Sequence, residues 1–313
     1  MPTIASNSRL GDRVQRTTDA PLPRRYVQFV DERFAPLLHL PLIAILVGPT
    51  HVASWTASGG DISTILWWPA IVSGIAVALA LLAMRADDDA KDAAADLVGR
   101  PDRPVPRGVV SADELRRLAS GCLALGAIVT LGLPSAATIA FLVAAAFLWL
   151  AGRDFMAPRL VHRDLLAYAL VHAPGIPLLA LFVWWSNPAA SWHPSLAALL
   201  LLTAGATFCL EISRKTCAPE DERHSVETYS GAYGPGTAMA IAATALAISA
   251  LAAAWYAFSF TGAGWAVAVP SLAVLVAAGV LTLRRRLPIA AFRSLVSGTA
   301  VFLILSPIVV AIT

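Results

Sequence analysis

Charged residues are scarce in this sequence, and cysteine is rarer still. Only 14% of the 313 residues are Asp, Glu, Lys or Arg, whereas 58% are hydrophobic and the mean hydropathy is +0.69. This balance excludes a water-soluble globular protein, because such domains carry about 25% charged residues. The three cysteines are an odd number without metal-ligand spacing, so they indicate small packing residues rather than a disulfide framework.

Two further features are missing, and each absence narrows the class of membrane protein. No series of segments of about ten residues alternates between apolar and polar side chains, as barrel strands do, so the backbone must be satisfied within helices. No apolar stretch follows a basic start within residues 1–30, so we do not expect a cleaved signal peptide. We expect residues 1–30 to form a basic, disordered arm near anionic lipid, followed by a membrane domain over residues 31–313.

Apolar runs of about 20 residues recur along the rest of the chain, and each is long enough to cross ~30 Å of hydrocarbon as a helix. The sequence therefore predicts an all-α polytopic membrane protein. Its nine transmembrane helices are expected at residues 36–55, 62–84, 115–133, 135–151, 164–186, 194–213, 235–259, 263–283 and 288–312.

The distribution of charge predicts the orientation of these helices. All 23 Lys and Arg residues lie in the N-terminal arm, in the connections after the second, fourth, sixth and eighth apolar runs, or at the adjoining helix ends. Of the 20 acidic residues, Asp61 is the one that lies on the other side. The positive-inside rule then places the N-terminus in the cytoplasm and the C-terminus outside. We expect an integral protein of a bacterial inner (plasma) membrane.

The most polar stretch of the chain follows the second apolar run, where residues 87–102 hold six of the 20 acidic residues. In a helix, Asp88, Asp92 and Asp96 would share one face, with Asp89 beside them. Like charges spaced in this way repel by roughly 0.2–0.5 kcal/mol per pair. A hard divalent cation would remove that penalty, and carboxylates with open water positions suit Mg²⁺. The alternative is a solvated acidic connector between two membrane helices.

Two other local patterns lie in the connections. Residues 99–108 contain three prolines and two glycines, which predict a constrained loop, and Ser111 with Glu114 predicts a capping box at the start of the third helix. The prolines at 174 and 177 predict a kink in the fifth helix. A second group of acidic and basic residues ends the sixth helix, again on the predicted cytoplasmic side: Glu211, Arg214, Lys215, Glu220, Asp221, Glu222 and Arg223.

The first acidic stretch resembles the aspartate-rich signature of the UbiA superfamily of intramembrane prenyltransferases. That signature reads Asn/Asp-Asp-x-x-Asp-x-x-x-Asp, and residues 88–96 fit it, with Asp88 in the leading position. Arg85 and the stretch Arg103-Pro-Val-Pro-Arg107-Gly108 also resemble the family, and the second acidic group occupies the place of the family's other aspartate motif. The resemblance spans residues 30–313.

The resemblance implies nine helices in a ring around a central cavity, with two acidic cytoplasmic loops that hold Mg²⁺ against an isoprenyl diphosphate. The metal ligands that it implies are Asp88, Asp89, Asp92, Asp96, Glu211, Glu220 and Asp221. The catalytic carboxylates would be Asp88, Asp92, Asp96 and Asp221. The cations expected to bind the diphosphate are Arg85, Lys91, Arg159, Arg214 and Lys215. In the second motif, Lys215 follows Glu211 at the spacing where the family has an aspartate. Counted back from Thr228 and Gly234, Asp221 is the better match to a family ligand.

The implied reaction transfers a prenyl group to a lipophilic, aromatic acceptor and releases diphosphate; no nucleic-acid partner is expected. One alternative is a terpene cyclase on the same scaffold, in which the allyl cation closes on itself. Another is a transporter, which is disfavoured because the charges cluster at one membrane face rather than at the midplane. Aromatic side chains could stabilise the cation, although tryptophans at membrane interfaces are commoner. The available tryptophans are Trp67, Trp68, Trp149, Trp184 and Trp185.

Overall fold

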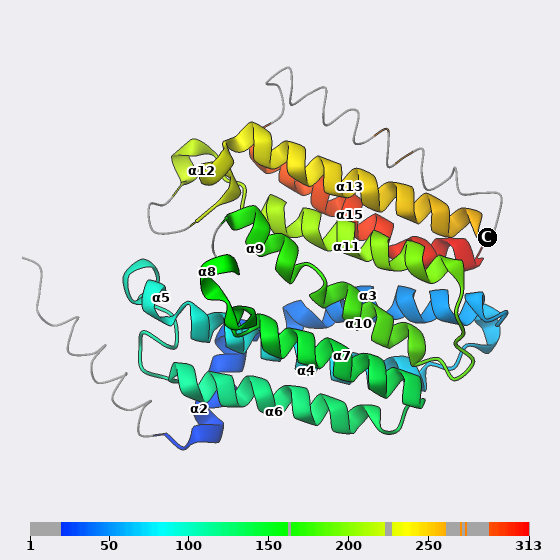
Figure 1. The fold of residues 1–313 in the computed structure, drawn as a ribbon, viewed down its shortest axis with the longest axis horizontal. Helices are drawn as coiled ribbons and strands as arrows, with labels where there is room; N and C mark the ends of the chain where they lie inside the picture. The colour runs from blue at the N-terminus through cyan, green and yellow to red at the C-terminus, as the bar shows by residue number, and fades with distance from the viewer. Residues whose placement is uncertain are drawn as a thin grey trace, which may run out of the picture.

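The computed structural model describes residues 20–161, 164–222, 227–260 and 288–312, together with Pro270 and Ala273. Within these residues the chain is helical and contains no strand. Figure 1 shows long helices packed side by side with their axes roughly aligned. Short elements gather at one end of this bundle: α2 (Leu22–Phe29), α5 (Ala93–Gly99), α8 (Pro158–Val161) and α12 (Tyr229–Tyr233).

Eight of the nine predicted segments coincide with helices. They are α3 (Pro36–Ala57), α4 (Trp68–Lys91), α6 (Ala112–Thr130), α7 (Ser135–Ala151), the pair α9 (Leu165–His172) and α10 (Gly175–Trp185), α11 (Pro194–Arg214), α13 (Pro235–Phe258) and α15 (Ile289–Ile312). The remaining segment, at residues 263–283, lies outside the described residues apart from two positions. The count of nine spans and their arrangement as a ring therefore stay predictions.

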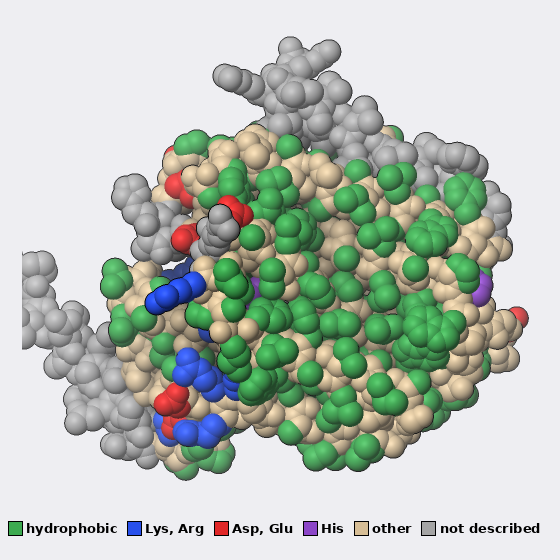
Figure 2. Space-filling view, viewed as in Figure 1, with side chains coloured by type: hydrophobic (Ala, Val, Ile, Leu, Met, Phe, Trp, Pro, Cys, Tyr) green, Lys and Arg blue, Asp and Glu red, His purple; other side chains and the backbone are tan. Residues whose placement is uncertain are grey.

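Among the described residues, six helical segments are long and apolar enough to cross a membrane, if the pair α9 and α10 is counted as one segment. Figure 2 shows that hydrophobic side chains cover most of the visible face of the bundle, whereas Lys, Arg, Asp and Glu gather at one end of it. We call this end, where α2, α5, α8 and α12 lie, the polar end. Apolar side chains that face outward along whole helices need lipid around them. The protein is therefore an integral membrane protein.

The core divides into two groups of helices with a joint between them. Helices α11, α13 and α15 pack against one another, and α4, α6 and α7 form a second group. Helices α3 and α10 contact members of both groups and join them (Figure 1). Large side chains are completely buried in both groups, with Tyr256 and Phe292 in the first and Phe141 in the second, where it packs edge-on against Phe182 of α10.

Two local predictions are confirmed. Helix α9 ends at His172 and α10 begins at Gly175, so the fifth predicted helix is broken at its proline pair. Ser111 caps α6: its hydroxyl accepts from the Glu114 amide, and the Glu114 carboxylate accepts from the Ser111 amide. These features depend on residues adjacent in sequence, which explains why the sequence reveals them.

The structure differs from the expected disordered arm at its C-terminal part. Residues 22–29 form α2, and a π-helical turn, η1 (Val30–Phe34), continues directly from it. The Arg25 guanidinium forms two hydrogen bonds with the Glu114 carboxylate, at 3.0 and 2.6 Å, and Phe29 is completely buried. Packing against α6 therefore orders a segment whose composition alone predicts disorder.

The close approach of α11 and α13 generates a stability prediction. A Cβ atom at Gly205 would lie 2.7 Å from the Ala245 carbonyl oxygen, whereas one at Gly121 in α6 would meet nothing within 4 Å. We expect Gly205→Ala to destabilise the protein by about 1–3 kcal/mol, because backbone cannot yield as a side chain can. Thermal unfolding in detergent measures this effect. Gly121→Ala is the control and should raise the melting temperature slightly; equal shifts would contradict the packing.

Candidate functional site

The predicted aspartate face is present at the polar end, at the junction of α4 and α5. The Asp92 amide donates to the Asp88 carbonyl at 2.9 Å, and the Asp96 amide donates to the Asp92 carbonyl at 2.8 Å. The helical spacing is therefore kept from Asp88 to Asp96. The run is nevertheless not one regular helix, because α4 ends at Lys91 and Asp92 separates it from α5.

The four aspartates of this face differ in accessibility. The side chains of Asp88 and Asp92 are 54% and 56% exposed, whereas those of Asp89 and Asp96 are 2% and 7% exposed. Although the Asp92 carboxylate is accessible, the surrounding protein reduces its hydration. This desolvation and the negative charge of Asp96 raise the pKa of Asp92, and the positive charge of Arg103 opposes that rise. An additional cation at the two accessible carboxylates would favour their charged forms.

The two buried aspartates each have an arginine from another segment. The Arg33 guanidinium binds Asp89 in a bidentate ion pair, with Nε to Oδ2 at 2.5 Å and Nη2 to Oδ1 at 2.8 Å. Arg103, in the proline-containing loop, donates to Asp96 at 2.6 Å and lies 3.6 Å from Asp92. Charge-assisted bonds of this kind offset the cost of burying a carboxylate.

Lys91 faces a different side of α4 and belongs to a mixed polar and aromatic cluster. Its ammonium donates to the Tyr168 hydroxyl at 3.0 Å and to the Ala151 carbonyl at 3.3 Å, and it lies 3.5 Å from Asp154 and 3.7 Å from Asp88. The Tyr168 ring stacks on His172 at 4.1 Å between centroids. Lys91 therefore links Asp88 to α9.

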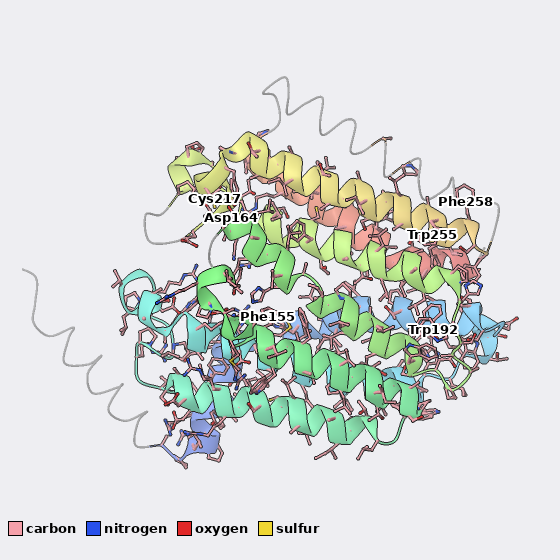
Figure 3. All side chains as sticks on the ribbon, in the orientation of Figure 1. Phe155, Asp164, Trp192, Cys217, Trp255 and Phe258 are labelled. Carbon is pink, nitrogen blue, oxygen red and sulfur yellow. The ribbon has the colours of Figure 1, made fainter. Side chains whose placement is uncertain are left out.

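A strained turn places one more aromatic side chain in this cluster. Asp154, Phe155 and Met156 of η3 (Asp154–Met156) have φ values of 48°, 54° and 57°, which cost roughly 1–3 kcal/mol each outside glycine. Phe155 packs edge-on against His172, with 5.4 Å between the ring centroids. Figure 3 labels Phe155 between the end of α7 and α8. The aromatic cluster thus lies beside Lys91 at the polar end.

Asp87 is a further buried acid that the sequence does not single out. Its side chain lies against the Gly152 backbone, and its Oδ2 atom is 4.0 Å from the Arg153 guanidinium. Arg153 in turn stacks over the Trp149 ring at 3.9 Å. Asp87 therefore faces the end of α7 and not the exposed aspartate pair.

The second acidic group contains two kinds of carboxylate. Glu211 pairs with cations of its own helix, Arg214 at 2.7 Å and Lys215 at 2.9 Å, and Glu220 and Asp221 are exposed on η4 (Pro219–Asp221). Glu222 accepts hydrogen bonds from the hydroxyls of Thr228 and Ser230, which lowers the pKa of its carboxyl and closes the loop before α12. Figure 3 labels Cys217 and Asp164 near this loop, between α9 and α12.

The five cations predicted to bind the diphosphate do not lie together. Arg85 lies 4.0 Å from Asp89, and Lys91 is within the first site, as described above. Arg214 and Lys215 stay with Glu211, and Arg159 is exposed on α8. Only Arg85 and Lys91 of the five are shown in contact with the first motif. The roles of all five in binding diphosphate stay predictions.

The donor chemistry of the first site fits Mg²⁺. Asp88 and Asp92 offer accessible carboxylate oxygens one helical turn apart, and Mg²⁺ is commonly held by one or two carboxylates, with water and phosphate completing its octahedron. Among the described residues, no three His, Cys, Asp or Glu side chains are grouped as a metal site. The predicted convergence of both acidic motifs on shared metal ions therefore stays a prediction.

Of the five proposed tryptophans, Trp149 stacks under Arg153 beside Asp87 at the end of α7, whereas the other four lie away from this site. Trp67 and Trp68 begin α4, which at 1.5 Å per residue places them about 30 Å from Asp88 along the helix. Trp184 is buried and Trp185 stacks edge-on against Trp192. Figure 3 shows Trp192 with Trp255 and Phe258 at the end opposite the polar end. Interfacial anchoring explains the exposed members of this group.

Comparisons with known proteins agree with this fold. No protein-family model and no curated protein matches the chain. A solved digeranylgeranylglyceryl phosphate synthase is 18% identical with a TM-score of 0.57, and a UbiA homologue from Archaeoglobus fulgidus bound to DMAPP and Mg²⁺ is 15% identical with a TM-score of 0.57. Each match covers 88% of this chain and 98% of the other. The chain therefore has the fold of the UbiA-type membrane proteins, and the resemblance drawn from the sequence is confirmed at that level.

Two ion pairs of contrasting burial provide a test of the site's construction. Arg103 and Asp96 are both largely buried, whereas Arg214 is 65% exposed beside Glu211. We expect Arg103→Ala to cost about 3 kcal/mol, because it leaves a buried carboxylate unpaired. Arg214→Ala should cost less than about 1 kcal/mol. Thermal unfolding of the two variants measures the difference, and a larger loss from Arg214→Ala would contradict the described burial.

Proposed function

We propose that the protein is a Mg²⁺-dependent intramembrane prenyltransferase that moves an isoprenyl group from its diphosphate to a lipophilic, aromatic acceptor. The observation that carries this proposal is the exposed pair Asp88 and Asp92, which lies at the polar end of a membrane bundle with Arg103 and Lys91 within 4 Å. The fold and the Mg²⁺ complex of its structural neighbour support the same reaction class.

In this mechanism Asp88 and Asp92 would hold Mg²⁺, which supplies charge neutralisation for the departing diphosphate. The allylic C–O bond breaks and its electron pair leaves with the diphosphate. Lys91, Arg85 and Arg103 are placed to stabilise the negative charge that develops there. The acceptor carbon then forms the new C–C bond, and the proton that it loses passes to water.

The aromatic cluster of Tyr168, Phe155 and His172 supports the cationic part of this reaction. Aromatic faces attract cations most strongly where water is excluded. The cluster lies next to Lys91, which also pairs with Asp88, so its rings are close to the proposed metal site. These side chains replace the tryptophans that the sequence suggested for the same role.

The proposed orientation places the polar end in the cytoplasm, with the N-terminus on that side and the C-terminus outside. The gathering of Lys and Arg at this end supports it (Figure 2). Asp61, the acidic residue predicted on the outer side, caps η2 (Ile62–Thr64) by accepting from the Ser63 amide at 2.7 Å. A local capping role accounts for its presence there.

Asp92→Ala tests the proposal directly. We expect it to lower the turnover of prenyl diphosphates by about 10²-fold or more, because half of the accessible carboxylate pair is lost. The measurement is Mg²⁺-dependent pyrophosphate release by purified protein, with and without aromatic acceptors. Asp113→Ala is the matched control, since Asp113 is an exposed aspartate paired with Arg116 on α6.

The outcomes of that assay separate the candidate functions. Acceptor-dependent release indicates the transferase, whereas release with cyclic hydrocarbon products and no acceptor indicates a cyclase. Asp92→Ala with wild-type turnover would reject the assignment of this carboxylate. Wild-type protein without any pyrophosphate release would reject both enzymes and leave the transporter.

A further inference from the structure

The N-terminal segment (residues 22–34), which comprises α2 and η1, lies across the polar end. It is held there by three ion pairs with residues more than 50 positions away: Arg25 with Glu114, Glu32 with Arg107, and Arg33 with Asp89. Each pair makes two hydrogen bonds. The segment therefore contacts α6, the proline-containing loop and the end of α4 together.

A π-helical turn sets the direction of the last two of these pairs. The Ala35 amide donates to the Val30 carbonyl, five residues back, and Ala35 itself has a φ of 39°. Turns of this kind are rare in proteins overall, but those that occur often lie at functional sites. Phe34 is buried beside the turn and stacks on His39 at 4.0 Å, so the turn is fixed by packing.

The four aspartates of the first motif fall into two pairs. In one pair each carboxylate is bound by an arginine: Arg33 donates to both oxygens of Asp89, and Arg103 donates to Asp96. The other pair is Asp88 and Asp92. The Asp89 side chain is only 2% exposed, so a metal ion could reach its remaining lone pairs only if the contact with Arg33 opened and left a largely buried guanidinium unpaired. Asp88 and Asp92 are more than half exposed, and their ion-pair partners Lys91 and Arg103 lie farther away, at 3.7 and 3.6 Å, so a metal ion can reach them without breaking a bidentate pair.

We propose that Arg33 is a positioning residue of the metal site: it withdraws Asp89 from metal binding and fixes the last turn of α4, so that Asp88 and Asp92 bind the divalent cation. This inference rests on the proposed function. It also assigns Arg33 to the site, although this residue precedes the first membrane helix. A structural bridge without influence on metal binding is the competing explanation.

Binding of Mn²⁺, with and without pyrophosphate, distinguishes these explanations without relying on turnover. The titration uses full-length protein in detergent and follows free Mn²⁺ by electron paramagnetic resonance. We expect Asp92→Asn to weaken binding at least tenfold and Asp89→Asn to change it by less than about threefold. Arg33→Ala should weaken binding about tenfold, because second-shell partners commonly have effects of that size. Thermal unfolding of each variant confirms that it is folded.

Two further variants make the test specific. In Arg33→Ala the buried Asp89 carboxylate is left unpaired, which displaces the last turn of α4 and with it Asp88 and Asp92. Arg33→Ala/Asp89→Asn removes that unpaired charge and should recover most of the lost affinity, as expected for residues that act through each other. Arg25→Ala removes another bidentate pair from the same segment, distant from the aspartates, and should leave Mn²⁺ affinity unchanged.

Three results would overturn the proposal. Asp89→Asn that binds Mn²⁺ as weakly as Asp92→Asn would make Asp89 a ligand. Arg25→Ala and Arg33→Ala with equal effects on Mn²⁺ affinity would make the segment a structural bridge alone. Wild-type protein that binds no Mn²⁺ even with pyrophosphate would reject the proposed function and this inference together, whereas the first two results leave the proposed function standing.

Discussion

Mutual repulsion among carboxylates is the constraint on which the polar end depends. Five aspartates lie within residues 87–96, and they can be charged together only if cations from elsewhere neutralise part of the set. Arg33 and Arg103 provide that neutralisation from other segments and Lys91 adds to it from within the run, and each lies within 4 Å of at least one aspartate. The ends of the surrounding elements are thereby tied to α4. Asp88 and Asp92 remain accessible, and a metal ion can neutralise their negative charge.

This division explains why so acidic a stretch is compatible with a stable membrane protein. The buried members, Asp89 and Asp96, act as attachment points for the N-terminal segment and for the proline-containing loop. Lys91 performs the same task toward α9, where the strained turn at Asp154–Met156 holds Phe155 against His172. Stability and proposed chemistry therefore use different members of one motif, and the strain is stored next to the site.

The sequence predicts the parts of this structure that depend on neighbouring residues. Hydropathy locates the helices, the prolines at 174 and 177 locate the break between α9 and α10, and Ser111 with Glu114 locates the start of α6. It does not reveal that Arg33 binds Asp89, because the two residues are 56 positions apart and no local pattern links them. The ion pair of Glu211 with Lys215 is local and follows from the four-residue spacing, whereas the role of Glu211 as a metal ligand stays a prediction.

The central claim is that Asp88 and Asp92 bind the divalent cation while Asp89 stays in its bidentate ion pair with Arg33. The most direct measurement is a crystal structure with Mn²⁺ and pyrophosphate, in which anomalous scattering locates the metal. The account predicts an anomalous peak between the carboxylates of Asp88 and Asp92, with both hydrogen bonds from Arg33 to Asp89 intact. A metal bound by Asp89 after Arg33 has moved away, or a metal bound without either Asp88 or Asp92, would contradict it.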